Sequence, residues 1–155
     1  MILRTARPDT RGRGLAAGLE HSIRYVSRLS NNGAGINGNS WIVNSLPYLH
    51  YGSVIVDDKP AEVAMVKGLA TRWIWEDGAY RGQQGTRRHL TIDAITGDYI
   101  VSGPRGQRWV FFGPDAVAAL RGQIKSSTSA KGITEFADYD IDQRLASLTH
   151  VEPVT

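Results

Sequence analysis

Apolar residues recur at helical spacing in two stretches of the chain. In the first stretch an apolar side chain stands at every third or fourth position between polar ones: Leu15, Leu19, Ile23, Val26 and Leu29. Because a helix turns once in about 3.6 residues, this spacing places all of them on a single face. The pattern predicts an amphipathic helix from about residue 15 to 30, and a loop rich in glycine and asparagine after it.

The second helical stretch begins after two residues that suit the start of a helix. Asp58 can cap the first turn, and Pro60 is tolerated within that turn. The apolar residues that follow return to one helix face: Val63, Val66, Leu69, Ala70 and Trp73. We expect a helix over residues 60–75, and we expect it to be the main core helix.

The middle of the chain alternates apolar and polar residues, as strands do. Thr96-Gly97 and Gly103-Pro-Arg-Gly106 interrupt this alternation with residues that favour hairpin turns. Three strands are therefore predicted at about 87–95, 98–103 and 107–112. They form a β-meander.

Alternation also predicts how the meander divides its side chains between two faces. One face is expected to carry four apolar or aromatic residues: Tyr99, Val101, Trp109 and Phe111. Arg108 is expected on the other face. Outside the meander, two shorter strands are predicted at about 40–45 and 51–56.

The remaining segments give weaker signals. Residues 1–14 combine arginine, proline and glycine without an apolar period, which indicates an extended arm. Residues 76–85 form a polar, glycine-bearing loop. A helix is expected over about 114–124, a linker over 126–132 and a short helix over about 140–148.

These elements predict a single α+β domain. Its antiparallel sheet has about five short strands, two main helices pack on the sheet, and both ends of the chain are extended arms. A chain of 155 residues is long enough to bury the core of one domain. We expect a basic N-terminal arm at 1–14, the domain at 15–125, and a linker with an acidic C-terminal tail at 126–155.

The charged residues are unevenly distributed along the chain. The net charge is +3, and 14 arginines stand against 4 lysines. Four arginines crowd the N-terminal arm: Arg4, Arg7, Arg11 and Arg13. Acidic residues gather near the other end: Glu135, Asp138, Asp140 and Asp142. Oppositely charged arms of this kind favour contacts between copies of the same protein.

No group of residues predicts a reactive centre. The chain has no cysteine, which excludes disulfides, thiolate nucleophiles and cysteine-ligated metals. The histidines do not have the spacing of metal ligands: His21, His50, His89 and His150. His89-Leu-Thr matches half of the paired signature of two-histidine phosphoesterases, and no second half accompanies it. We therefore expect no catalytic residue, no metal and no cofactor.

Two other features were weighed for function. Asp57 and Asp58 form either a carboxylate pair tuned by mutual repulsion or the cap of the helix over 60–75. Capping explains their position more simply. No apolar run approaches the ~18 residues of a membrane span, and the N-terminus is too polar for a signal peptide. We expect no contact with a membrane.

An alternative function is nucleic-acid binding by the meander. The candidate phosphate contacts are five arginines: Arg81, Arg87, Arg88, Arg105 and Arg108. Three aromatic residues between them could stack on bases: Tyr99, Trp109 and Phe111. The simpler explanation, which we favour, is that alternate residues divide between core and solvent.

Residues 35–56 carry a series of motifs in a fixed order. Gly35, Asn39 and Trp41 open the first predicted strand. This strand ends at the corner Asn44-Ser-Leu-Pro-Tyr48, because proline cannot donate to a strand ladder. The aromatic-glycine pair Tyr51-Gly52 then begins the next strand.

The series continues with Pro60, Met65 and Val66 at the start of the predicted core helix. With the long N-terminal helix before it, this order resembles the tail-completion or neck proteins of tailed bacteriophages. The resemblance covers residues 15–75. Two departures stand out, since Asn31 to Gly35 replace a Pro-Val-Asp-Thr-Gly stretch and His50 replaces an acidic residue.

The resemblance implies a structural protein of a virion. It implies a position at the head–tail junction or at the tail end, assembly of copies into a ring, and contact with other tail or connector proteins. The protein would then occur in the virion, and in the host cytoplasm during assembly. The arginines would contact neighbouring proteins or DNA.

Overall fold

Antiparallel strands make up all the secondary structure in the part of the chain that the computed structural model describes. That part comprises residues 46–67 and 69–153, together with the backbone of four short strands before them. No helix occurs in these residues, and so none that could cross a membrane. The predicted α+β class is wrong for the described residues, which are all-β.

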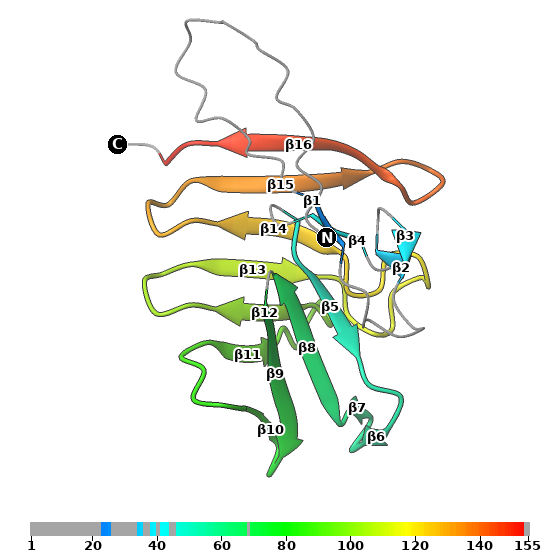
Figure 1. Ribbon diagram of the computed structural model, residues 1–155, viewed down its shortest axis with the longest axis vertical. Helices are drawn as coiled ribbons and strands as arrows, with labels where there is room; N and C mark the ends of the chain where they lie inside the picture. Colours follow the sequence, from blue (N-terminus) through cyan, green and yellow to red (C-terminus); the bar gives the residue numbers. More distant parts are fainter. Residues whose placement is uncertain are drawn as a thin grey trace, which may run out of the picture.

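Two sheets dominate the architecture (Figure 1). The four-stranded sheet has the order β10-β9-β8-β5, with these bounds: β5 (Tyr48–Tyr51), β8 (Glu62–Lys67), β9 (Leu69–Glu76) and β10 (Ala79–Gly82). The six-stranded sheet is a meander in chain order: β11 (His89–Ile92), β12 (Tyr99–Ser102), β13 (Arg108–Phe111), β14 (Ile124–Thr128), β15 (Thr134–Tyr139) and β16 (Leu145–Val151).

Three two-stranded ribbons accompany the main sheets. β1 (Ile23–Tyr25) pairs with β4 (Trp41–Val43), and β2 (Ala34–Gly35) pairs with β3 (Gly38–Asn39). β6 (Ile55–Val56) pairs with β7 (Lys59–Pro60). Strand β4 confirms the strand predicted at about residues 40–45.

The core lies between the two main sheets. The four-stranded sheet and the segment before it contribute five buried residues to one cluster: Leu46, Leu49, Val63, Met65 and Trp73. Tyr80 of β10 joins them, and the six-stranded sheet contributes Leu90, Tyr99, Val101, Trp109, Phe111 and Ile124. In Figure 1 the strands of the four-stranded sheet cross β11 to β13, while β15 and β16 extend beyond them. Burial of these apolar surfaces supplies most of the driving force for folding.

The predicted core helix over 60–75 is wrong, because the segment forms the β8–β9 hairpin. Val63 pairs with Trp73, and Met65 pairs with Thr71. The apolar residues of this segment fit both a period of 3.6 and a period of 2, so spacing alone could not separate them. Its β-branched and aromatic residues favour a strand. The chain before Pro60 also differs, since it is a hairpin turn and not a cap.

The other predicted helices are also not found where the structure is described. Most of the helix over 15–30 lies outside the described residues, but Ile23–Tyr25 is strand β1. Residues 114–123 form turns, and β14 starts at Ile124. The helix over 140–148 is instead a turn followed by β16, and the segment expected as a linker holds β14.

The meander at 87–112 is confirmed. The register pairs Tyr99 with Phe111 and Val101 with Trp109. All four side chains are buried, whereas Arg108 is exposed on the opposite face, as the alternation predicted. This part of the prediction held because residues two apart on a strand share a face, and the large rings of Tyr99, Trp109 and Phe111 all stand on the same one.

Two tight turns reverse the chain direction, one between β9 and β10 and one in the β6–β7 ribbon. Asp77 and Gly78 both have positive φ and join Glu76 to its partner Ala79, as in a two-residue type I′ hairpin. Asp57 and Asp58 also have positive φ, at 50° and 60°. They connect Val56 to Lys59 in the same way. The two aspartates therefore serve a turn, and neither a carboxylate pair nor a helix cap is needed to explain them.

Candidate binding groove

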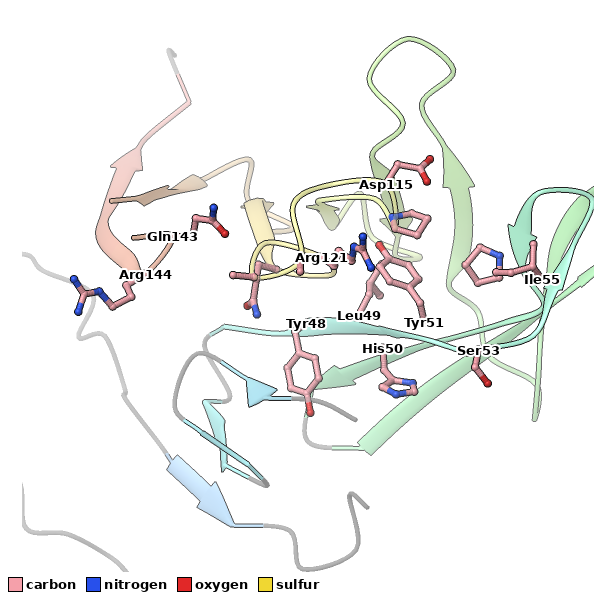
Figure 2. Close-up of a pocket in the computed structure, with 16 residues that line it drawn as sticks. Tyr48, Leu49, His50, Tyr51, Ser53, Ile55, Asp115, Arg121, Gln143 and Arg144 are labelled. Atoms are coloured by element: carbon pink, nitrogen blue, oxygen red, sulfur yellow. The ribbon is translucent and has the colours of Figure 1, made fainter. Parts of the chain in front are cut away.

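An open groove of about 750 Å³ runs along β5 (Figure 2). One wall consists of β5 and the residues that follow it, up to Ile55. The other side is formed by the loop Pro114 to Gln123 and by Gln143 and Arg144 in the β15–β16 turn. A volume of this size is typical of sites that hold a small molecule or a short peptide segment.

The outer edge of β5 lies along this groove. Among the described residues β5 ends the four-stranded sheet, and β8 is the strand that pairs with it. The Leu49 backbone N–H points away from β8 and donates to the Gly122 carbonyl over 2.8 Å. Because backbone direction alternates along a strand, the N–H and C=O groups of Tyr51 point the same way. The strand thus presents backbone hydrogen-bonding groups to the groove.

The loop opposite β5 is fixed by backbone contacts. Phe112 N–H donates to the Gln123 carbonyl and Gly122 N–H donates to the Phe112 carbonyl, each over 3.0 Å. Gly122 has a φ of 71°, and a Cβ at this position would lie 2.0 Å from the Leu49 carbonyl oxygen. Only glycine permits this backbone to approach β5 so closely. The groove wall is therefore held at a set distance from the strand.

Two side chains of the loop offer polar groups to a ligand. Gln123 is only 7 % exposed, and its Oε1 atom has no hydrogen-bond donor among the described residues. Arg121 is exposed, and its Nε donates to the Ala116 carbonyl over 2.9 Å. No carboxylate of the described residues forms a salt bridge with Arg121. Figure 2 shows the Asp115 carboxylate turned away from the Arg121 guanidinium.

Contacts of Tyr51 tie the β5 side of the groove to the six-stranded sheet and the chain that follows β13. The Tyr51 hydroxyl donates to the Phe112 carbonyl over 2.7 Å, and its ring packs edge-on against Tyr99 with centroids 5.1 Å apart. Burial raises the pKa of Tyr51 well above its ordinary value, and the neighbouring Tyr99 and Asp98 raise it further. Tyr51 is consequently a structural hydroxyl and not an acid or base at neutral pH.

The groove holds no evident catalytic group. His50 projects from the opposite side of β5 to Leu49 and Tyr51 (Figure 2). Residues 46–67 and 69–153 contain no group of three His, Asp or Glu side chains able to hold a metal ion. The arrangement can bind and orient a ligand through hydrogen bonds and one cation.

Four of the arginines selected from the sequence gather at one end of the six-stranded sheet. The ladder pairs His89 with Ser102, and Ser102 with Arg108. Arg87 and Arg88 precede β11, and Arg105 lies in the β12–β13 turn. All three arginines therefore flank these two rungs. Lys131, in the β14–β15 turn, lies at the same end, which is on the left in Figure 1. We call Arg87, Arg88, Arg105, Arg108 and Lys131 the basic end.

The other selected arginines lie elsewhere. Arg81 is an exposed residue of β10. Arg4, Arg7, Arg11 and Arg13 lie outside the described residues. The structure therefore brings four of the nine selected arginines together, and the four of the N-terminal arm lie outside the residues that it describes.

The aromatic residues expected to stack on bases are not available for that role. Tyr99, Trp109 and Phe111 are buried in the core. Lys67 and Arg88 lie over the Trp109 ring, with the Lys67 Nζ 4.6 Å and the Arg88 Cζ 5.3 Å from its centroid. Burial lowers the pKa of Lys67, Arg88 lowers it further, and Glu135 opposes the change. Trp109 thus anchors two cations of the protein itself.

The opposite end of the same sheet is rich in aspartate. Its turns and strand ends carry five such residues: Asp93, Asp98, Asp115, Asp140 and Asp142. Asp98 is buried, and its Oδ2 accepts a hydrogen bond from Lys125 Nζ over 2.7 Å. Arg144 pairs with Asp140 and Asp142 in the β15–β16 turn. We call this group the acidic end.

Sequence reasoning missed the groove. Its lining comes from Tyr48 to Ile55, from the loop 114–123 and from Gln143 and Arg144, which are far apart along the chain. The loop lies where the sequence predicts a helix over about 114–124, and a helix there gives no reason to expect a groove beside β5. A usable signal was Gly122, because a glycine next to a strand start often permits close backbone contact.

Comparisons of the chain with protein-family models, with curated proteins and with solved structures find no match.

Proposed function

We propose that this protein is a structural module that associates with a second copy of itself through the free edge of β16. The observation that supports the proposal is the state of that edge. β16 is seven residues long, pairs with β15 on one side, and has no partner strand among the described residues on the other. It contains neither proline nor lysine, which commonly prevent edge-to-edge pairing.

The other ends of the main sheets are less open. β10 is only four residues long and lies next to β11, so these two edges shield each other. The Trp73 indole N–H donates to the Arg88 carbonyl over 3.2 Å and holds the chain before β11 against β9. The Gly122 carbonyl accepts from the β5 edge. β16 is therefore the longest edge in the described residues without such cover.

Apolar side chains continue to the β16 edge. Ala137, Leu145 and Leu148 are partly buried and pack against the core cluster. They share the inner face of the sheet: Ala137 pairs with Leu148, and Tyr139, two positions further along β15, pairs with Leu145. A further strand beside β16 would cover the remaining exposed parts of these side chains, and burial of apolar surface favours association.

The charges of the sheet favour an antiparallel second copy. When two β16 strands pair antiparallel, the basic end of one copy lies beside the acidic end of the other. Lys131 then faces the turn that contains Asp140 and Asp142, and all three residues belong to the β14–β16 region. A parallel arrangement would place like charges side by side. Two-fold symmetry closes this contact, so the expected assembly is a dimer.

The test is the mass of the protein in solution across a concentration series, measured by light scattering after size exclusion. The register of β15 and β16 is regular from Ser147 to Val151, and Thr149 is the exposed centre of that stretch. In an antiparallel pair, Thr149→Lys places two lysines close together and should yield monomers. Thr149→Glu should do the same, and a mixture of the two variants should recover the dimer.

Thr91→Lys is the matched control, since Thr91 is an exposed strand residue on β11, at the far side of the sheet. It should leave the mass unchanged. A wild-type protein that stays monomeric at high concentration contradicts the proposal. So does a Thr149→Lys variant that still dimerises.

A second candidate function is nucleic-acid binding at the basic end. It is favoured by the register that brings Arg87, Arg88, Arg105 and Arg108 to one end of the sheet. Since the rings are buried, contact would be with phosphates and without sequence preference. Gel shift with a 30-base single strand should then weaken steeply with salt. Arg105→Gln with Arg108→Gln should reduce both affinity and the salt slope, whereas Arg81→Gln should change neither.

The role in a phage virion stays a prediction. It depends on residues 15–75, and the core helix that the resemblance implied over 60–75 is a β-hairpin. Ring assembly would need a head-to-tail contact, which the light-scattering mass distinguishes from a dimer.

A further inference from the structure

We propose that the groove along β5 binds an extended peptide segment of a partner protein, and that this segment carries a carboxylate side chain. The site is separate from the β16 edge and does not depend on the self-association proposed above. Three features of the groove support it: the free strand edge, the unpartnered Gln123 oxygen and the Arg121 guanidinium.

The strand edge indicates a polypeptide ligand. Leu49 N–H already donates to a backbone carbonyl, that of Gly122, in the manner of a strand ladder. The groove also borders the residues that follow Leu49: Tyr51, Gly52 and Ser53. The backbone N–H and C=O of Tyr51 point into that space. A strand laid along an open edge supplies an acceptor and a donor at the required spacing.

Gln123 gives the second argument. A buried amide oxygen without a hydrogen-bond donor costs about 1–3 kcal/mol relative to a satisfied one. Gln123 lines the groove, and its Oε1 has no donor among the described residues. The oxygen itself has no exposed surface, so a peptide N–H in the groove satisfies it only when the Gln123 side chain rotates toward the ligand.

Arg121 defines the chemistry of one ligand side chain. Its Nε donates to the Ala116 carbonyl, which orients the guanidinium. The remaining guanidinium N–H groups can receive a carboxylate in a bidentate arrangement. Arg144, on the same groove, is already paired with Asp140 and Asp142. The acidic side chain of the ligand should therefore reach Arg121.

The test starts from the Thr149→Lys variant, so that self-association does not compete. A displayed library of random ten-residue peptides is selected on this protein, and the enriched peptides are synthesised and titrated by calorimetry. We expect enriched peptides to share an Asp or Glu. Arg121→Gln should weaken their binding at least tenfold, and N-methylation of the central backbone amides should abolish it. Arg105→Gln is the matched control for charge and should leave binding unchanged.

Gln123→Met separates a binding role from a structural one. The substitution keeps the length of the side chain and removes the unpartnered oxygen, so the urea midpoint of the free protein should rise while peptide binding weakens. A fall in the urea midpoint would mean that Gln123 serves the fold, and would overturn the inference. Failure to enrich any peptide, or enrichment of peptides that bind equally well after Arg121→Gln, would overturn it as well.

Discussion

Contacts of a few single residues set the geometry of the groove. Gly122 permits the loop to touch β5, and Tyr51 ties β5 to the Phe112 carbonyl. Asp98 and Lys125 form a partly buried ion pair next to the same loop, and the Lys125 Nζ lies 4.7 Å from the centroid of the Phe112 ring. Each contact joins residues from different elements, so each one sets a distance between elements.

Gly122→Ala should destabilise the protein by about 2–4 kcal/mol, since a positive φ and a backbone clash act together. The added Cβ would lie 2.0 Å from the Leu49 carbonyl oxygen. Gly106→Ala is the control, because Gly106 has a φ of 77° and no atom within 4 Å of its ideal Cβ position. It should cost only about 1 kcal/mol from backbone strain. Urea unfolding measures both, and equal losses would show that the contact with β5 does not matter.

At the scale of elements, the decisive feature is the choice between helix and strand. The segment 60–75 has enough apolar residues to satisfy either period, and the outcome depended on its neighbours. As the β8–β9 hairpin it places Val63, Met65 and Trp73 on one buried face. The Asp77-Gly78 turn then adds β10, which brings Tyr80 to the core. The Asp77-Gly78 pair between apolar runs is the strongest hairpin signal in this region. The sequence analysis instead predicts a loop over residues 76–85, which includes this pair.

The tail of the chain shows the same effect. Residues 126–132 are rich in serine and were expected to be a linker, yet Ser126, Ser127 and Thr128 are rungs of β14. Polar residues suit this strand because little of its inner surface beyond Ile124 is buried. The composition of a segment does not show whether a neighbouring strand will pair with it.

For the molecule as a whole, a shared tyrosine cluster joins the two sheets. The Tyr80 hydroxyl donates to the Pro60 carbonyl over 2.8 Å and lies 3.2 Å from the Tyr99 hydroxyl. Burial raises the pKa of Tyr80 and of Tyr99, and their mutual contact raises the pKa of Tyr80 further. The folded protein therefore retains these protons at a pH where the unfolded chain loses them.

Stability should fall as the pH rises above about 10, the value at which unfolded tyrosines titrate. Below that pH both states hold the protons, so the contribution of the cluster is fully present there. Above it the folded state binds more protons than the unfolded state, and stability decreases with pH. Urea unfolding at intervals from pH 8 to 11 measures this slope.

Tyr80→Phe isolates the effect of the cluster from other alkaline groups. Lys67 acts in the opposite sense, because burial lowers its pKa and its contribution to stability improves as the pH rises. The variant keeps Lys67 and removes one tyrosine, so its alkaline slope should be shallower than that of the wild type. Its free energy of unfolding at pH 8 should also be about 1 kcal/mol lower, because the hydrogen bond of the Tyr80 hydroxyl is lost. Parallel slopes would contradict the assignment.

The sequence by itself determined the strands in which large apolar side chains recur at every second position. The meander over residues 87–112, its buried Tyr99, Val101, Trp109 and Phe111, and the exposed Arg108 all followed from alternation, because a strand in a two-layer fold must separate its faces. Tertiary structure alone decided the remainder. Segments with two compatible periods took the form that their neighbours could pair with, and the groove exists only where β5, the loop 114–123 and the β15–β16 turn meet. Contacts between distant residues have no signature in local spacing, and Gly122 marks a close backbone approach without showing which strand it approaches.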